Sequence, residues 1–270
     1  MITLLLASGS KDLEGEDWFV EEATKRNVLV EHYWPDKQIN KHYDIAIVRG
    51  NPSKLKDVVN YADIVVNDPR VTQHYRYKDN QLMAASKFFT VPETLLANNT
   101  RSYDFYKSIL GHPFVAKACL GSKGNQVFLV NTEKKFKHSL TIADILQEQI
   151  KSSYGRDVRV FVIGDRVVAS MVRQARGSDF RSNLALGGTA TKYDLPIEIQ
   201  QKCISLIKDI GYDYAGIDLM FGEKDGEYIF CELNSVPGLW GIQQATNVNV
   251  TGLLVDYCIN KVKELQLNYE

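Results

Sequence analysis

Short apolar runs alternate with polar and helical segments along the first 75 residues. The runs predict buried strands at Ile2–Ala7, Val28–Tyr33, Tyr43–Val48 and Ala62–Asn67. Helical spacing over Glu16–Arg26 and near Leu55–Asn60 places helices between strands. This rhythm is typical of a small parallel sheet covered by helices. The spacing of Gly9 and Gly15 does not match a dinucleotide-binding loop, so we exclude one here.

The pattern changes after residue 75, where strands and hairpins dominate. Helices are expected at Val71–Lys87, Ser102–Leu110, Pro196–Ile210 and Asn249–Leu267, with a surface turn or short helix at Thr132–Leu140. Strands are expected at Phe88–Ala97, Pro113–Ala118, Val127–Asn131 and Ile145–Ile150. The turn Gly164-Asp165 joins Val158–Ile163 to Val167–Arg173 as a hairpin, and Ser178–Gly188 reads as a polar loop.

Two further apolar runs carry carboxylates that buried strands normally exclude. Asp218 lies in Ala215–Phe221, and Glu232 lies in Tyr228–Leu233 with Asn234 just after it. Alternation puts Glu232 and Asn234 on one strand face, and the turn after the first run allows a hairpin. Three oxygen ligands suit a hard cation such as Mg²⁺. Two amphipathic strands with solvated carboxylates explain the same pattern, so this stretch leaves both interpretations open.

Composition narrows the class of protein. The 270 residues suffice for one large or two to three small domains, and a net charge of −1 leaves no electrostatic footprint for nucleic acid or anionic membrane. No apolar run approaches a membrane span, and we interpret the start, MITLLLASGS, as a first strand rather than a signal peptide. The four cysteines are far apart in the sequence, as expected of core residues in a reducing cytoplasm.

Several polar features suggest a nucleotide site. Lys117 leaves a strand just before Gly121-Ser122-Lys123-Gly124, where a lysine and mobile backbone N–H groups could contact phosphates, although this is also an ordinary hairpin tip. The strand end 147–150 could present backbone groups to an adenine edge. Asp157 and Arg159 share one strand face, which suits a ribose hydroxyl and a phosphate or a simple surface edge.

An arginine and a polar loop complete the set. Arg173 ends the apolar run VVASMV, and the loop carries Asp179-Phe180-Arg181-Ser182-Asn183 before Gly187-Gly188. Arginine is well shaped for bidentate contact with carboxylate or phosphate. The alternative is a solvated loop, but an arginine that ends a buried strand favours a site.

The order of these motifs resembles the ATP-grasp fold and, within it, the RimK type of amino-acid and peptide ligases. The resemblance rests on GRDVRVFVIGDRVVASMVRQARGSDFRSNLALGGTA, AGIDLM and CELNSVPGLWGIQQATNVNV, and its motifs cover roughly residues 71–255. It implies an α/β (α+β ATP-grasp) protein with ATP between two antiparallel sheets. The expected domains are a small parallel α/β domain at 1–75, a small lid subdomain at 76–150 and a metal- and substrate-binding subdomain at 151–270.

The resemblance also assigns residues. It implies ATP contacts from Lys78, Lys117, Gly121, Ser122, Gly124, Glu148, Gln149, Ile150, Asp157, Arg181, Ser182 and Asn183. Asp218, Glu232 and Asn234 would hold two Mg²⁺ ions, with Mn²⁺ as a substitute, and Arg173 and Arg181 would be catalytic. Departures from the family pattern at Gln126, Gln149 and Asn247 concern the glycine turn, the adenine edge and the substrate end.

The implied reaction joins a carboxylate to an amine through an acyl phosphate and releases ADP and phosphate. The partners would be a carboxylic acid and an amino acid or amine, which could be a peptide or protein terminus, without nucleic acid or membrane. A homo-oligomer and a cytoplasmic location are expected. Two alternatives stay open, a ligase for a specialised metabolite that is not an amino acid and a regulatory ATP-binding protein without turnover.

Overall fold

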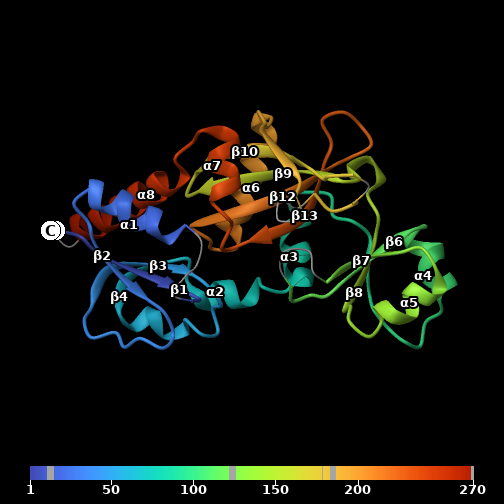
Figure 1. Ribbon diagram of the computed structural model, residues 1–270, viewed down its shortest axis with the longest axis horizontal. Helices are drawn as coiled ribbons and strands as arrows, with labels where there is room; N and C mark the ends of the chain where they lie inside the picture. Colours follow the sequence, from blue (N-terminus) through green and yellow to red (C-terminus); the bar gives the residue numbers. More distant parts are fainter. Residues whose placement is uncertain (11–14, 122–125, 178, 183–186, 269–270) are drawn as a thin grey trace.

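The computed structural model describes residues 1–10, 15–121, 126–177, 179–182 and 187–268 (Figure 1). In these ranges the chain forms three sheets, which follow one another in the sequence. The first sheet is parallel, and its strand order is β2 (Leu29–Tyr33), β1 (Thr3–Ser8), β3 (Tyr43–Arg49) and β4 (Ala62–Val66). Helix α1 (Glu16–Lys25) and the short 3₁₀ helix η1 (Lys56–Asn60) connect its strands. The predicted parallel sheet is confirmed.

The second sheet is antiparallel and carries two short helices. Its strand order is β5 (Thr94–Leu96), β8 (Ile145–Glu148), β6 (Phe114–Lys117) and β7 (Val127–Val130). The helices are α4 (Tyr103–Leu110) and α5 (Glu133–Ser139), so the 132–140 segment is a short helix. Aromatic side chains fill the core between helices and sheet, with Tyr106, Phe114 and Phe136 each at most 3% exposed.

The third sheet is antiparallel, and its residues share hydrophobic cores with residues of both other sheets. Its strand order is β11 (Thr189–Lys192), β10 (Arg166–Gln174), β9 (Arg156–Ile163), β12 (Tyr214–Phe221) and β13 (Tyr228–Asn234). Its helices are α6 (Ile197–Asp209), α7 (Trp240–Thr246) and α8 (Val250–Leu267), and the 3₁₀ turn η2 (Lys151–Ser153) precedes it. Gly164, at a φ of 58°, forms the predicted β9–β10 turn.

The faces of β9 separate hydrophobic core from polar site. Val158, Val160 and Val162 point into a core shared with α6 and β12. Asp157 and Arg159 alternate with them and face a cavity, as the sequence pattern predicts.

The C-terminal helix packs on the N-terminal sheet. In Figure 1, α8 lies beside α1 at the same end of the molecule as β1–β4. Leu6 and Phe19 share one core with Leu254 and Val255, and Arg26 of α1 donates to Asp256 of α8 at 2.6 Å. The predicted domain boundaries at 75 and 150 fall between the sheets, but this shared core joins the first and third segments. The division into three domains stays a prediction.

Two predicted elements are wrong. The helix expected at 71–87 is two helices, α2 (Pro69–His74) and α3 (Lys78–Ala85), because side chains take the place of the helical N–H donors between them. Asn80 donates to the His74 carbonyl at 2.9 Å, and Gln81 donates to the Tyr75 carbonyl at 2.8 Å.

The strand expected at 88–97 is regular only at β5. Thr90 instead accepts from the Phe230 backbone of β13 at 2.9 Å, so the segment leaves the third sheet before it enters the second. Pro92 lies at this crossing, where its missing N–H is tolerated. Among the described residues, no helix is long and apolar enough to cross a membrane.

Candidate functional site

A cavity of about 840 Å³ opens between the second and third sheets and reaches the first. Seven basic and four acidic side chains line it, and this excess of positive charge suits a polyanionic ligand. The basic residues are Arg49, Lys78, Lys117, Arg156, Arg159, Arg173 and Arg181, and the acidic residues are Glu148, Asp157, Asp218 and Glu232.

The hairpin of β12 and β13 places its polar residues on the cavity wall. Asp218 lies opposite Glu232 in the antiparallel register, and Gly216 lies opposite Asn234. The register shifts after Asp218, because Cys231 is an extra residue in β13. Asp218, Glu232 and Asn234 therefore line one cavity, as the alternation of residues predicts.

Asp218 is paired with two arginines. Its carboxylate accepts from Arg159 Nε and Nη2, the latter at 2.8 Å, and lies 2.9 Å from Arg173 Nη2. Burial opposes ionisation of this group, but the two guanidiniums outweigh it and hold the pKa of Asp218 below its usual range. Asp218 is thus an anion whose oxygens are already engaged.

Asp157 has the same kind of partner. Both of its oxygens accept from Arg173, at 2.7 and 2.6 Å, across neighbouring strands. Arg173 is buried, and Asp218 and Asp157 raise its pKa although burial works against the charge. Arg173 therefore holds two carboxylates in place. A ribose contact by Asp157 and a catalytic role of Arg173 stay predictions.

Glu232 differs from Asp218. Within the described ranges its carboxylate makes no hydrogen bond, and burial raises its pKa against the opposing effect of Lys78 and Lys117. The Asn234 side-chain nitrogen beside it is buried without a hydrogen-bond partner.

These groups fit a hard cation. Carboxylate and amide oxygens are the ligands that Mg²⁺ prefers, and a cation would offset the raised pKa of Glu232. In the described part of the chain, no cluster of three or more His, Cys, Asp or Glu could hold a metal ion. The candidate set therefore consists of two carboxylates and an amide, of which Asp218 would be shared with its arginines.

Two lysines act electrostatically on Glu232. Lys117, at the end of β6, donates to the Gln147 side chain at 2.6 Å, and Lys78, at the start of α3, donates to the Gly121 carbonyl at 3.3 Å. Both lysines are buried and line the cavity. A buried ammonium beside a metal-type carboxylate suits phosphate oxygens.

The end of β8 lines the cavity next to these lysines. Glu148, Gln149 and Ile150 all contribute, as predicted. The Glu148 carboxylate accepts from the Glu93 backbone at 2.9 Å, so it fastens the crossing segment as well as facing the cavity.

The polar loop after β10 is described only in part. Arg181 and Ser182 line the cavity, and Arg181 pairs with Asp179 at 2.9 Å. Gly121 lies beside the cavity through its contact with Lys78 rather than in its lining. Ser122, Gly124 and Asn183 lie outside the described residues.

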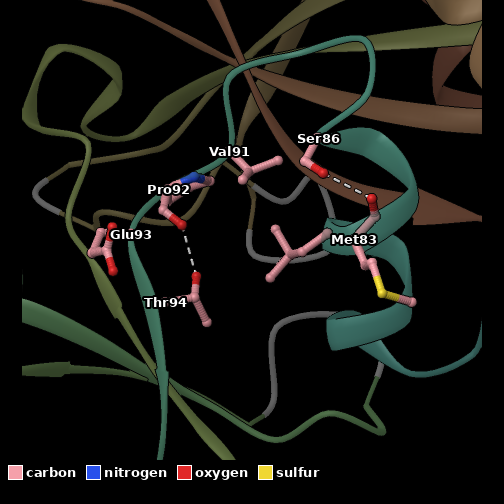
Figure 2. Close-up of a pocket in the computed structure, with 7 residues that line it drawn as sticks. Met83, Ser86, Val91, Pro92, Glu93 and Thr94 are labelled. Carbon is pink, nitrogen blue, oxygen red and sulfur yellow. Dashed lines mark hydrogen bonds between the residues drawn. The ribbon is translucent and has the colours of Figure 1, made fainter.

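A second, smaller hollow lies between α3 and β5 (Figure 2). Its volume is about 290 Å³, and its hydroxyls are already used, since Ser86 donates to the Met83 carbonyl and Thr94 to the Pro92 carbonyl, both at 2.8 Å. The larger cavity is therefore the candidate site.

Sequence reasoning left several cavity residues unassigned. Arg159 was noted only for its strand face, and Arg49 and Trp240 carried no signal. Arg49 ends an ordinary buried strand, and only the packing of the first sheet against the third brings it to the cavity.

Comparison with known proteins identifies the family of this chain. A profile described as "RimK-like ATP-grasp domain" matches residues 74–258. The chain belongs to the RimK-like ATP-grasp family. The ATP-grasp fold and the family resemblance expected from the sequence are thereby confirmed, and ATP is the nucleotide that this family uses.

A similar curated protein is the "Probable alpha-L-glutamate ligase" of Cellvibrio japonicus (strain Ueda107), which is 36% identical over 188 residues. The match covers 67% of this chain and 62% of that protein, so the chain spans about three fifths of the relative's length.

Two solved structures are similar over nearly the whole chain. The ATP-grasp ligase PsnB complexed with minimal precursor, Mg and ADP has a TM-score of 0.74 and 18% identity, and covers 96% of this chain and 98% of its own. The macrocyclase MdnC bound with precursor peptide MdnA, from Microcystis aeruginosa MRC, has a TM-score of 0.77 and 15% identity, and covers 96% and 100%. At these identities the likeness establishes the ATP-grasp fold alone.

Proposed function

We propose that this protein is an ATP-dependent ligase that joins a carboxylate to an amine and releases ADP and phosphate. The observation that carries the proposal is the lysine-flanked, hydrogen-bond-free carboxylate of Glu232 in a cavity with excess positive charge. Transfer of a phosphoryl group needs positioning and charge stabilisation more than covalent chemistry by the protein, and this cavity offers both.

Each group has a proposed task. Lys78 and Lys117 bind the ATP phosphates, the 148–150 strand end borders adenine, and Asp157 meets the ribose while it holds Arg173. Arg181, Ser182 and Asn183 are proposed to contact ATP and the acceptor, and Gly121, Ser122 and Gly124 are proposed to contact the phosphates. Asp218, Glu232 and Asn234 would hold two Mg²⁺ ions, with Mn²⁺ as a substitute, and the bound ions would supply neutralisation of the charge on the transferred phosphoryl group.

The proposed reaction has two steps, and the substrates supply all the atoms that are exchanged. A substrate carboxylate attacks the γ-phosphate, forming an acyl phosphate and ADP, and the amine then displaces phosphate and forms the amide. Arg173 and Arg181 are the proposed catalytic cations. Arg173 acts by its charge from behind Asp157 and Asp218, because all of its described hydrogen bonds go to these carboxylates.

The substrate class is an amino acid as one partner, and L-glutamate is its first candidate. The curated relative is named as a probable glutamate ligase, and two of the similar structures hold peptide substrates. The acceptor is a small acid, a peptide or a protein terminus. We further propose a cytoplasmic location, which the four free cysteines support, and we leave a homo-oligomer as an expectation.

The test is ADP release with ATP and Mg²⁺ across a panel of acids and amines that includes L-glutamate. Glu232→Ala is expected to abolish turnover, at least about 100-fold, and to leave the fold intact. Glu223→Ala, in the exposed turn of the same hairpin, is the matched control and is expected to be fully active.

Near-normal ADP release by Glu232→Ala would refute the metal assignment. ATP binding by the wild-type protein without substrate-dependent ADP release would favour the regulatory alternative.

A further inference from the structure

An arginine with unused hydrogen-bond donors lies where the first sheet meets the cavity. Arg49 is the last residue of β3, is 2% exposed and lines the cavity. Its Nε and Nη1 atoms are buried and have no hydrogen-bond partner among the residues that the structure describes. The carboxyl ends of parallel strands, where Arg49 lies, are the edge at which open α/β sheets bind ligands.

The position of Arg49 is fixed by its surroundings. Its guanidinium lies over the Phe19 ring at 5.0 Å from the centroid. The next residue, Gly50, crosses Gly9 so closely that an added Cβ would lie 2.5 Å from the Gly9 nitrogen. The Tyr214 hydroxyl donates to the Val48 carbonyl at 3.1 Å beside it. The arginine is therefore held by packing, and its Nε and Nη1 donors have no partner among the described residues.

No carboxylate of the described residues forms an ion pair with this arginine. Arg49 acts electrostatically on Glu16 and on Tyr214, but no ion pair within 4.0 Å joins Arg49 to Glu16 among the described residues. Glu16 accepts instead from Ser8 at 2.8 Å and contacts His32, and burial raises its pKa to about 7. A permanently charged guanidinium with unmet donors is costly unless a ligand satisfies it.

Arg49 and the two lysines of the cavity have different neighbours. Lys78 and Lys117 both act electrostatically on Glu232, whereas Arg49 acts on Glu16 and Tyr214. Phe19, under the guanidinium, shares a core with Leu239, which precedes Trp240 in the cavity wall. Arg49 thus packs on the Phe19 ring, whereas the two lysines act on Glu232.

We propose that Arg49 binds a carboxylate of the amino-acid substrate that is not consumed in the reaction. This inference rests on the proposed ligase function and adds a specificity residue from outside the family match, which begins at residue 74. Ligation consumes the carboxylate of one partner and the amine of the other, so an amino acid that supplies the amine retains its α-carboxylate, and glutamate retains a carboxylate in either role. The planar guanidinium can donate charge-assisted hydrogen bonds to it.

The probes are L-glutamate, L-glutamine and L-isoglutamine. L-Glutamine carries an amide in place of the γ-carboxylate, and L-isoglutamine carries one in place of the α-carboxylate. Their binding to the protein with a non-hydrolysable ATP analogue and Mg²⁺ is measured by calorimetry. We expect L-glutamate to bind, and the amide that removes the Arg49-bound carboxylate to bind roughly 10- to 100-fold more weakly. The weaker amide identifies the α- or γ-carboxylate.

The variants are Arg49→Met and Arg49→Lys. Arg49→Met is expected to raise the Kd and KM for L-glutamate roughly 10- to 100-fold and to leave the KM for ATP within about twofold. Arg49→Lys keeps the charge without the planar guanidinium, so its Kd and KM for L-glutamate are expected to lie between those of the wild type and those of Arg49→Met. Arg166→Met, which replaces an exposed arginine of the β9–β10 turn, is the control.

Unfolding separates binding from structure. Because Nε and Nη1 make no hydrogen bond, ligand-free Arg49→Met is expected to melt no lower than the wild type. Wild-type glutamate affinity in folded Arg49→Met, or in Arg49→Lys if the first variant does not fold, would overturn the assignment. So would equal affinity of the wild type for all three probes. Absence of ADP release by a wild type that binds glutamate would instead refute the ligase function and leave the Arg49 site standing.

Discussion

Removal of Arg173 is expected to destabilise the fold. The side chain is 8% exposed, donates two hydrogen bonds to Asp157 and forms an ion pair with Asp218 at 2.9 Å. Arg173→Ala would leave Asp157 without its partner and Asp218 with Arg159 alone. A buried carboxylate that loses its cation is desolvated without compensation.

The magnitude follows from these contacts. Breaking a buried ion pair from one side costs about 3–5 kcal/mol. Thermal midpoints of proteins of this size shift by roughly 2–4 °C per kcal/mol, so the midpoint should fall by roughly 6–20 °C. Asp157→Asn in the same chain removes one of the stranded charges, and the double variant is expected to recover part of the loss.

The assay is urea unfolding of the ligand-free protein, with Arg166→Ala as the control. Arg166 is 68% exposed and its nearest carboxylate is 4.0 Å away, so this variant should stay within about 0.5 kcal/mol of the wild type. A loss of less than about 1 kcal/mol in Arg173→Ala would refute the buried ion network. In that case a catalytic arginine, free of structural duty, would be the better interpretation.

Two further predictions concern backbone packing and pH. Gly216→Ala would place a Cβ 2.8 Å from the Pro237 ring and should cost about 1–3 kcal/mol in unfolding free energy, whereas Gly238→Ala, with open space around it, should be neutral. Equal stability of the two variants in urea would contradict the contact. Hydrogen bonds from Lys25, then Arg26, lower the pKa of Glu22 to about 2 against the effect of burial. A depressed carboxyl pKa stabilises the fold above about pH 4.5 and this contribution is lost as the pH falls toward 2, so Glu22→Gln should flatten the acid side of the stability curve. An unchanged acid slope would show that Glu22 titrates normally.

The hairpin shows how far sequence reasoning reached. Alternation and the turn after Phe221 were enough to predict that Asp218, Glu232 and Asn234 share one face of paired strands. What those side chains contact was not predictable. The pairing of Asp218 with Arg159 and Arg173 depends on the order of β10, β9 and β12 in the sheet, which no local pattern specifies.

The missed features share a long-range cause. The break between α2 and α3 depends on side-chain amides and on a bond from the Lys78 backbone to the Cys119 carbonyl, 41 residues away in the chain. Arg49 becomes a cavity residue because α8 and the third sheet complete the core of the first. Asn247, by contrast, has a φ of 56°, a conformation that asparagine tolerates better than most residues.

The crossing at Thr90–Thr94 has a mechanical consequence. The second sheet lies in the chain between Thr90, which bridges to β13, and β9, the first strand of the third sheet, so the chain enters it at this crossing and leaves it after Glu148. The two crossings are tied together, because Glu148 donates its backbone N–H to the Glu93 carbonyl and accepts from the Glu93 N–H, both at 2.9 Å. Across the cavity, Lys78 reaches the Cys119 and Gly121 carbonyls only through bonds of 3.3 Å. A sheet fastened along one edge is held most firmly at that edge. A rotation of the second sheet about the Glu93–Glu148 edge, beside the proposed adenine edge, would therefore change the width of the cavity.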